Sequence, residues 1–204
     1  MNGNDKLLDA LTREGVLISV SVRYWRASKK LTAEDLGLDP ERLETDLISL
    51  GHKKLIPKEA MRQFALLEGR AHALVESNTF PFLNGLAHFL PNRKLEATTR
   101  SLSRLEQEFH EEKRRFMGKY AQTRDEAMRQ WQILARRLVP DPVKLLTVIE
   151  ESFPCPERME RCFGFSTDLF QLTIPEELGM NPVAAKDQME VMAAREKASR
   201  EAAE

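Results

Sequence analysis

Apolar side chains recur every seven residues along the middle of the chain, at Leu95, Leu102, Phe109 and Phe116. Residues 92–138 contain no proline and a single glycine, Gly118, so the pattern predicts a long helix. Asn92 can cap its start, because its side-chain oxygen can accept a hydrogen bond from a backbone N–H of the first turn. A helix of this length needs a partner that buries its apolar stripe. We therefore expect a helical hairpin or a coiled-coil arm over residues 92–138.

Two arrangements of this arm remain open from the sequence. Asp125–Leu138 either continues the helix or forms a second helix after a turn near Thr123. With the turn, the stripe would be buried in an internal hairpin. Without it, the heptad-like seam also permits a homodimer.

The stretch Val16–Trp25 is predicted to be a strand, because β-branched residues alternate with other side chains at a period of two. One face is polar in its middle, which indicates a sheet covered on one side only. The end of the stretch Phe163–Ile174 also has the character of a strand and could pair with it. The fold class predicted is α+β, mainly α-helical, with a small β-sheet beside the long helical arm.

Further helices are predicted from capping and breaking residues, over 5–13, 40–48, 57–76 and 142–153. Gly15 is expected to end the first of them in a left-handed conformation. Thr32 and Asp35 have the spacing of a capping box, and Asp141 precedes Pro142 as an N-cap.

The stretch Ser77–Pro91 breaks the helical pattern, and we expect its phenylalanines, Phe80 and Phe82, to lie on a loop that plugs an apolar site. Within it, Leu86–Leu90 fits a short strand or one helical turn equally well. Residues 1–178 are predicted to form a single domain, followed by an acidic, Ala- and Glu-rich tail over 179–204 that is helical or disordered.

Composition indicates a soluble protein, with 42% hydrophobic and 31% charged residues and no apolar run long enough to cross a membrane. The first residues are too charged for a signal peptide, so we expect a cytoplasmic location. The only two cysteines, Cys155 and Cys162, fit a reducing compartment.

Charge is distributed unevenly. Residues 92–138 hold 12 basic and 7 acidic side chains, whereas residues 139–204 hold 7 basic and 13 acidic ones. The bases either decorate a solvated helix face or form a surface for an acidic partner. Glutamates interrupt the basic stripe, which disfavours nucleic-acid binding without excluding it. The candidate partner-binding residues are Arg104, Lys113, Arg114 and Arg115.

No local motif for catalysis, phosphate binding or a cofactor is present in the sequence. The four histidines fall on different predicted elements, and six residues separate the two cysteines, so no metal site is predicted. We expect a protein that is not an enzyme and needs no cofactor.

The order of these elements resembles a bacterial and phage family, the domain of unknown function 3150, from Val16 to Ile174. The resemblance rests on a set of core, turn and cap residues: Leu31, Thr32, Asp35, Leu36, Gly51, Lys53, Pro57, Phe64, Phe82, Leu83, Gly85, Pro91, Leu105, Glu108, Phe109, Phe116, Tyr120 and Trp131. The acidic tail is not matched by it. The resemblance implies an association with a MoxR-type AAA+ ATPase and a von Willebrand A-type protein in mobile or phage-derived gene clusters.

The function hypothesis that follows is a non-enzymatic adaptor, an accessory subunit of such a AAA+ system. The alternatives are a nucleic-acid-binding accessory protein of a mobile element and a phage regulator that docks on a host protein.

Overall fold

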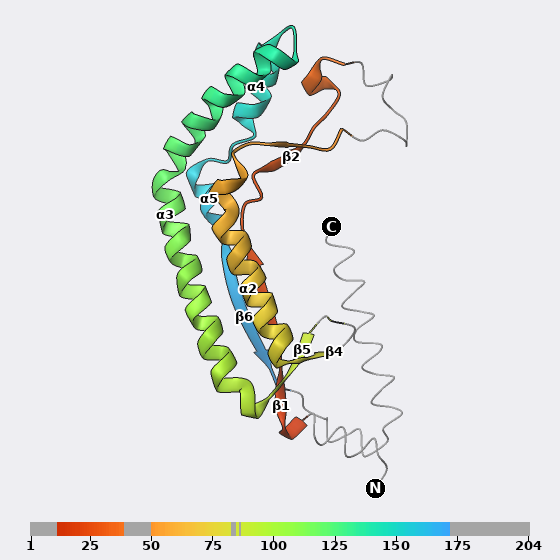
Figure 1. Ribbon diagram of the computed structural model, residues 1–204, viewed down its shortest axis with the longest axis vertical. Coiled ribbons are helices and arrows are strands. Elements are labelled where there is room, and N and C mark those ends of the chain that lie inside the picture. The colour runs from red at the N-terminus through yellow and green to blue at the C-terminus, as the bar shows by residue number, and fades with distance from the viewer. Residues whose placement is uncertain (1–11, 39–49, 83–84, 86, 172–204) are drawn as a thin grey trace. The chain divides into compact units, whose positions relative to one another are not determined.

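The computed structural model describes residues 12–38, 50–82, 85 and 87–171 (Figure 1). The predicted helices over 5–13 and 40–48 and the tail over 179–204 lie wholly or almost wholly outside these residues. The fold is α+β and mainly helical, as predicted. The chain divides into two compact units. The described part of the first unit is 12–20, 71–104 and 166–171, and that of the second is 21–38, 50–70 and 105–165.

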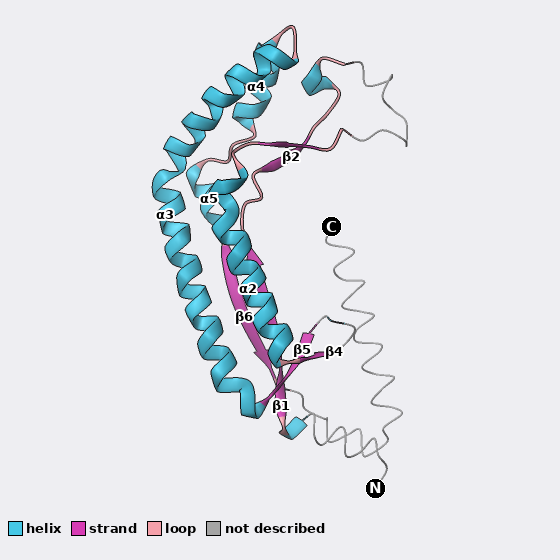
Figure 2. Cartoon of the chain, in the orientation of Figure 1, coloured by secondary structure: helices cyan, strands magenta, loops and turns pink. Residues whose placement is uncertain are grey.

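One four-stranded sheet has the order β4–β5–β1–β6 (Figure 2). Strand β1, Gly15–Arg23, is the predicted strand and pairs antiparallel with β5, Ala87–Pro91. Strand β6, Gly164–Phe170, lies on the other side of β1, so the predicted pairing is confirmed, but the strand begins earlier than the last six residues of Phe163–Ile174 that were predicted to form it.

The segment expected to form a plugging loop is instead two strands, β4, Phe80–Phe82, and β5, which pair antiparallel. Phe80 is 59% exposed, so it fills no apolar site. Of the two alternatives for residues 86–90, the strand is the one observed. Pairing with β1 decides this, because Gly15 faces Pro91 and Ile18 faces His88 in the antiparallel register.

Gly15 has a role different from the one predicted. It begins β1, and its backbone is not among the left-handed positions, which in the described residues are Ala27, Gly37, Gly51 and Gly85. A side chain there would collide with the ring of Phe89 and the carbonyl oxygen of Leu90. Gly15 is required for close approach between β1 and β5.

Helix α3, Asn92–Leu138, is continuous over 47 residues. No turn occurs near Thr123, so Asp125–Leu138 continues the helix. The first residue of the helix, Asn92, makes two hydrogen bonds to the chain before β1. Its side-chain Nδ2 donates to the carbonyl oxygen of Arg13 at 2.8 Å, and its backbone N–H donates to the carbonyl oxygen of Glu14 at 2.7 Å.

The apolar stripe of α3 is buried within the chain. In the second unit, Phe109 and Phe116 pack against Phe64 of α2, Arg62–Asn78, with ring centroids 5.4 and 6.0 Å apart. Phe163 lies 4.8 Å from the same ring. A homodimer through this seam would have to expose these rings, so the buried stripe does not supply one.

Shorter helical elements accompany α2 and α3 in the described residues. The 3₁₀ turn η3, Lys58–Met61, leads into α2, and together they form the helix predicted over 57–76. Helix α4, Pro142–Glu151, is capped by Asp141, whose carboxylate accepts from the N–H of Val143 at 3.1 Å, as predicted. Helix α5, Pro156–Arg161, was not predicted.

Candidate functional site

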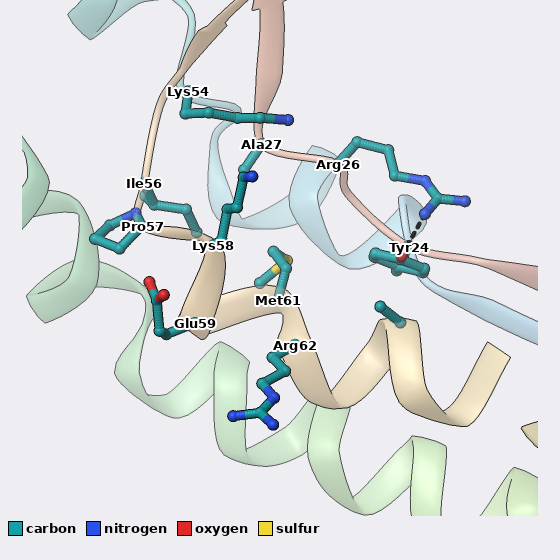
Figure 3. Close-up of a pocket in the computed structure, with 11 residues that line it drawn as sticks. Tyr24, Arg26, Ala27, Lys54, Ile56, Pro57, Lys58, Glu59, Met61 and Arg62 are labelled. Atoms are coloured by element: carbon teal, nitrogen blue, oxygen red, sulfur yellow. Dashed lines mark hydrogen bonds between the residues drawn. The ribbon is translucent and has the colours of Figure 1, made fainter. Parts of the chain in front are cut away.

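A pocket of about 490 Å³ lies within the second unit, a volume typical of small-molecule sites (Figure 3). Its walls come from the segment after β1, from the end of strand β3, His52–Lys54, and from the start of α2. The lining residues are Tyr24, Arg26, Ala27, Lys54, Ile56, Pro57, Lys58, Glu59, Met61, Arg62 and Ala65.

Two backbone features hold the upper wall together. Ala27 adopts a left-handed conformation with φ of 49°, which is unfavourable for a side chain with a Cβ. Its carbonyl oxygen accepts a hydrogen bond from the N–H of Leu55 at 2.8 Å, which joins the segment after β1 to the segment after β3. Both residues are buried, at 2% and 0% exposure, so the packing fixes the strained turn.

Strand β3 pairs antiparallel with strand β2, Ser28–Lys30, and a buried ion pair joins β3 to the segment that follows β2. The ammonium group of Lys53 lies 2.5 Å from the carboxylate of Asp35, with both side chains about 5% exposed or less. Asp35 also accepts from the N–H of Thr32, and Thr32 Oγ1 accepts from the N–H of Asp35. The predicted capping box is therefore present, at the 3₁₀ turn η1, Glu34–Leu36.

These contacts change the pKa of Asp35. Burial raises it, but the hydrogen bonds from Lys53 and from the backbone of Thr32, together with the charge of Lys53, outweigh burial and leave the pKa below its usual value. The carboxylate is thus charged at neutral pH and locks β2, β3 and η1 together.

One side of the pocket is formed by an ion-pair network. Arg26 binds Glu68 at 2.8 Å, donates to the hydroxyl of Tyr24, and stacks over the Tyr24 ring at 4.2 Å (Figure 3). Burial raises the pKa of Tyr24, and the nearby Glu68 carboxylate raises it further. The charge of Arg26 is balanced by the carboxylate of Glu68, with which it forms an ion pair.

Three other cations of the pocket have no acidic partner among the described residues: Lys54, Lys58 and Arg62. In Figure 3 the side chains of Lys54 and Lys58 extend toward the backbone around Ala27, whereas the side chain of Arg62 extends in the opposite direction. Glu59 is the one carboxylate in the described lining. The pocket thus combines a positive rim with a buried apolar floor of Ile56 and Met61.

A second feature of this unit is an exposed apolar surface, which we call the apolar end. It is made of four large side chains where α3 ends and α4 begins: Ile133, Leu134, Leu138 and Val143. Their exposed fractions run from 41% to 67%. Arg136, Arg137 and Lys144 interleave with them and have no acidic partner among the described residues, while Asp141 is engaged as the helix cap.

The four predicted partner-binding residues do not form one free surface. Arg104 falls in the first unit, and Lys113, Arg114 and Arg115 in the second. Lys113 lies 3.9 Å from Glu160, and Arg115 pairs with Glu112 at 2.6 Å. Arg104 and Arg114 are exposed and unpaired in the described part of the chain. The aromatic residues Phe109, Phe116 and Tyr120 of the same helix are buried, as predicted.

A family model described as "Protein of unknown function (DUF3150)" matches residues 12–204. The chain belongs to the DUF3150 family. The match extends beyond the resemblance over Val16 to Ile174 and includes the acidic tail. Four of the residues that carried the resemblance are buried in the core of this DUF3150 protein: Phe64, Phe109, Phe116 and Tyr120. Comparisons with curated proteins and with solved structures gave no match.

Sequence reasoning missed both candidate surfaces of this DUF3150 protein. A signal for the pocket is present, because Lys54, Lys58 and Arg62 recur every four residues across the start of α2. The adjacent pair Ile133-Leu134 is a sequence signal for the apolar end, because the side chains of two consecutive helix residues point in different directions from the helix axis. Within the described residues, no group of His, Cys, Asp and Glu could hold a metal ion, and no helix is long and apolar enough to cross a membrane.

Proposed function

We propose that this protein is a cytoplasmic, non-enzymatic adaptor that docks a partner protein through the apolar end. The observation that carries the proposal is that four large apolar side chains around the α3–α4 connection are exposed, Ile133, Leu134, Leu138 and Val143. Clustered apolar side chains on a surface, rimmed by polar ones, are typical of protein-interaction sites. Leu134 and Leu138 are four residues apart and so adjacent on one helix face.

The partner segment that fits this surface is an acidic amphipathic helix. Arg136, Arg137 and Lys144 give the apolar end a positive margin, and they are not neutralised by acids in the described part of the chain. An apolar helix face would cover the leucines, while glutamates or aspartates on its flanks would meet the cations. The match in charge favours this partner over a basic or purely apolar one.

As the class of partner we propose the one that the family resemblance implies, a AAA+ ATPase of the MoxR type or a von Willebrand A-type protein. The exposed arginines Arg104 and Arg114 are proposed to contribute secondary, salt-dependent contacts, together with Lys113 and Arg115 if their ion pairs open. Nucleic acid and a host protein targeted by a phage regulator are the competing partners.

The test is co-purification of the tagged protein from its native cells, with three chains compared. These are the wild type, the double variant Leu134→Asp/Leu138→Asp, and the control Leu66→Asp. Leu66 is a matched control because it is 49% exposed and lies in the same unit, on α2. Mass spectrometry quantifies each protein that accompanies the bait, and absorbance at 260 nm reports nucleic acid.

We expect a stoichiometric ATPase or von Willebrand A-type partner with the wild type and with Leu66→Asp, reduced at least about tenfold by the double variant, since two buried contacts would become desolvated charges. Equal recovery by the double variant would refute docking at the apolar end. Nuclease-sensitive absorbance without a protein partner would favour the nucleic-acid alternative instead.

A further inference from the structure

The basic pocket is a site separate from the apolar end, and its chemistry points to a ligand of its own. We propose that it binds a small phosphorylated molecule, with the phosphate held by Lys54 and Lys58 and an apolar or aromatic group resting on the floor of Ile56 and Met61. The volume of about 490 Å³ suits a ligand of this size.

The charge of the pocket selects for a dianion. Lys54 and Lys58 bring two positive charges that no acid among the described residues neutralises, and both side chains line the pocket (Figure 3). A phosphate monoester carries about −1.5 to −2 charges at neutral pH and can balance both lysines. A monocarboxylate would balance one. Lysine is a common phosphate ligand, acting as a compact point charge with three donors.

The other charged residues of the lining do not cancel this effect. Arg26 is engaged by Glu68 at 2.8 Å and stacks on Tyr24, so it forms the wall and keeps the Glu68 carboxylate away from a bound anion. The Glu59 and Arg62 side chains are turned away from the two ammonium groups (Figure 3). Because Glu59 and Arg62 have opposite charges, they contribute no net charge to the rim, and its net positive charge comes from Lys54 and Lys58.

The floor explains why the ligand carries more than a phosphate. Besides Ile56 and Met61, which are 3% and 7% exposed, the lining includes the exposed apolar residues Pro57 and Ala65, so an inorganic anion would leave this apolar surface uncovered. Met61 is unbranched and adapts to the shape of an apolar or aromatic group. A nucleic-acid strand is a poorer match, because Tyr24 is 8% exposed and offers little ring face for a base to stack on.

The proposal is tested by titrating the ¹⁵N-labelled full chain with four probes and following amide and Met methyl signals by NMR. The probes are phenyl phosphate, inorganic phosphate, benzoate and a single-stranded oligonucleotide. We expect phenyl phosphate to bind most tightly, at least about fivefold better than inorganic phosphate or benzoate, with shifts centred on Lys54, Lys58 and Met61. Tightest binding of inorganic phosphate would remove the organic group from the proposal.

Variants separate the two lysines from general surface charge. Lys58→Gln is expected to weaken phenyl phosphate binding by about tenfold, and Lys58→Arg to retain most of it. Lys29→Gln is the control, since Lys29 is an exposed lysine of the same unit outside the pocket. Equal weakening by Lys29→Gln, equal affinity for benzoate, or binding of the oligonucleotide alone would each overturn the proposal. So would the absence of shifts at the pocket.

Discussion

At the scale of single residues, Asp35 and Lys53 show how a buried charge can organise a short element. Strands β2 and β3 have three residues each, too short to be stable alone, yet the end of β3 contributes Lys54 to the wall of the pocket. The ion pair, with 2.5 Å between Lys53 Nζ and the Asp35 carboxylate, and the two hydrogen bonds of the capping box hold them to η1. The pair acts as a structural lock, because removing one partner would leave a buried charge unpaired.

We predict that Asp35→Asn lowers the free energy of unfolding at neutral pH by about 3–5 kcal/mol. The native pKa of Asp35 is lower than in the unfolded chain, so its contribution is present above the unfolded value and is lost as pH falls through the native pKa. Urea denaturation from neutral to acid pH measures this, with the exposed neighbour Glu34→Gln as control. A gap between wild type and Asp35→Asn that stays constant with pH would contradict the assignment.

Gly15 makes a second prediction at this scale. Gly15→Ala places a Cβ 2.5 Å from the Leu90 carbonyl oxygen and even closer to the Phe89 ring, and should destabilise the protein by about 1–3 kcal/mol. Gly118→Ala is the matched control, because nothing lies within 4 Å of its added Cβ and alanine favours the helix interior by about 0.5–1 kcal/mol. Thermal unfolding of the two variants should therefore move in opposite directions. A stable Gly15→Ala would show that the strands can separate slightly at no cost.

At the scale of elements, α3 is positioned by the aromatic rings that meet its stripe. Phe64 of α2 is fully buried and contacts four rings, those of Tyr24, Phe109, Phe116 and Phe163, with centroids 4.8 to 6.0 Å away. These rings come from different parts of the sequence. Phe64 therefore links the start of α2 to the middle of α3 and to the connection between α5 and β6 in one core. The same core supports the helix start that carries Lys58.

We predict that Phe64→Ala costs about 3–5 kcal/mol of stability, through lost contacts and the cavity left behind. Leu66→Ala, two positions along the same helix but 49% exposed, should change stability by no more than about 0.5 kcal/mol. Urea denaturation followed by circular dichroism compares the two variants. Similar losses in both would mean that the aromatic cluster is not the centre of this core.

The elements that the sequence predicted are those whose signal is local. The period of seven in residues 92–138, the alternation in β1 and the Asp141-Pro142 start of α4 were each sufficient alone. Strands β2 to β5 were missed or left ambiguous because each has three to five residues and depends on a partner strand distant in sequence. The pocket was missed for the same reason, since the connection after β1, the end of β3 and the start of α2 are distant in sequence and meet only in the fold.

At the scale of the whole molecule, the charge asymmetry of the sequence gains a different meaning. Basic residues of α3 were predicted either to decorate a solvated helix face or to form a surface for an acidic partner, and in the structure Arg100, Arg115, Arg124 and Arg129 are paired with glutamates. Unpaired cations of the described second unit include Arg114 of α3 and the cations beside the pocket and beside the apolar end. The adaptor proposal therefore depends on where charge is left uncompensated and apolar surface is left exposed, more than on the net charge of any segment.

The central claim, docking of a protein at the apolar end, is tested most directly by site-specific photo-crosslinking in native cells. A photoreactive amino acid is placed at Leu134 in one chain and at Leu66 in another, and crosslinked products are identified by mass spectrometry. The account predicts a single dominant protein adduct from position 134, through an acidic helical segment of the partner, and none of it from position 66. The same adduct from both positions, or none from position 134, would contradict it.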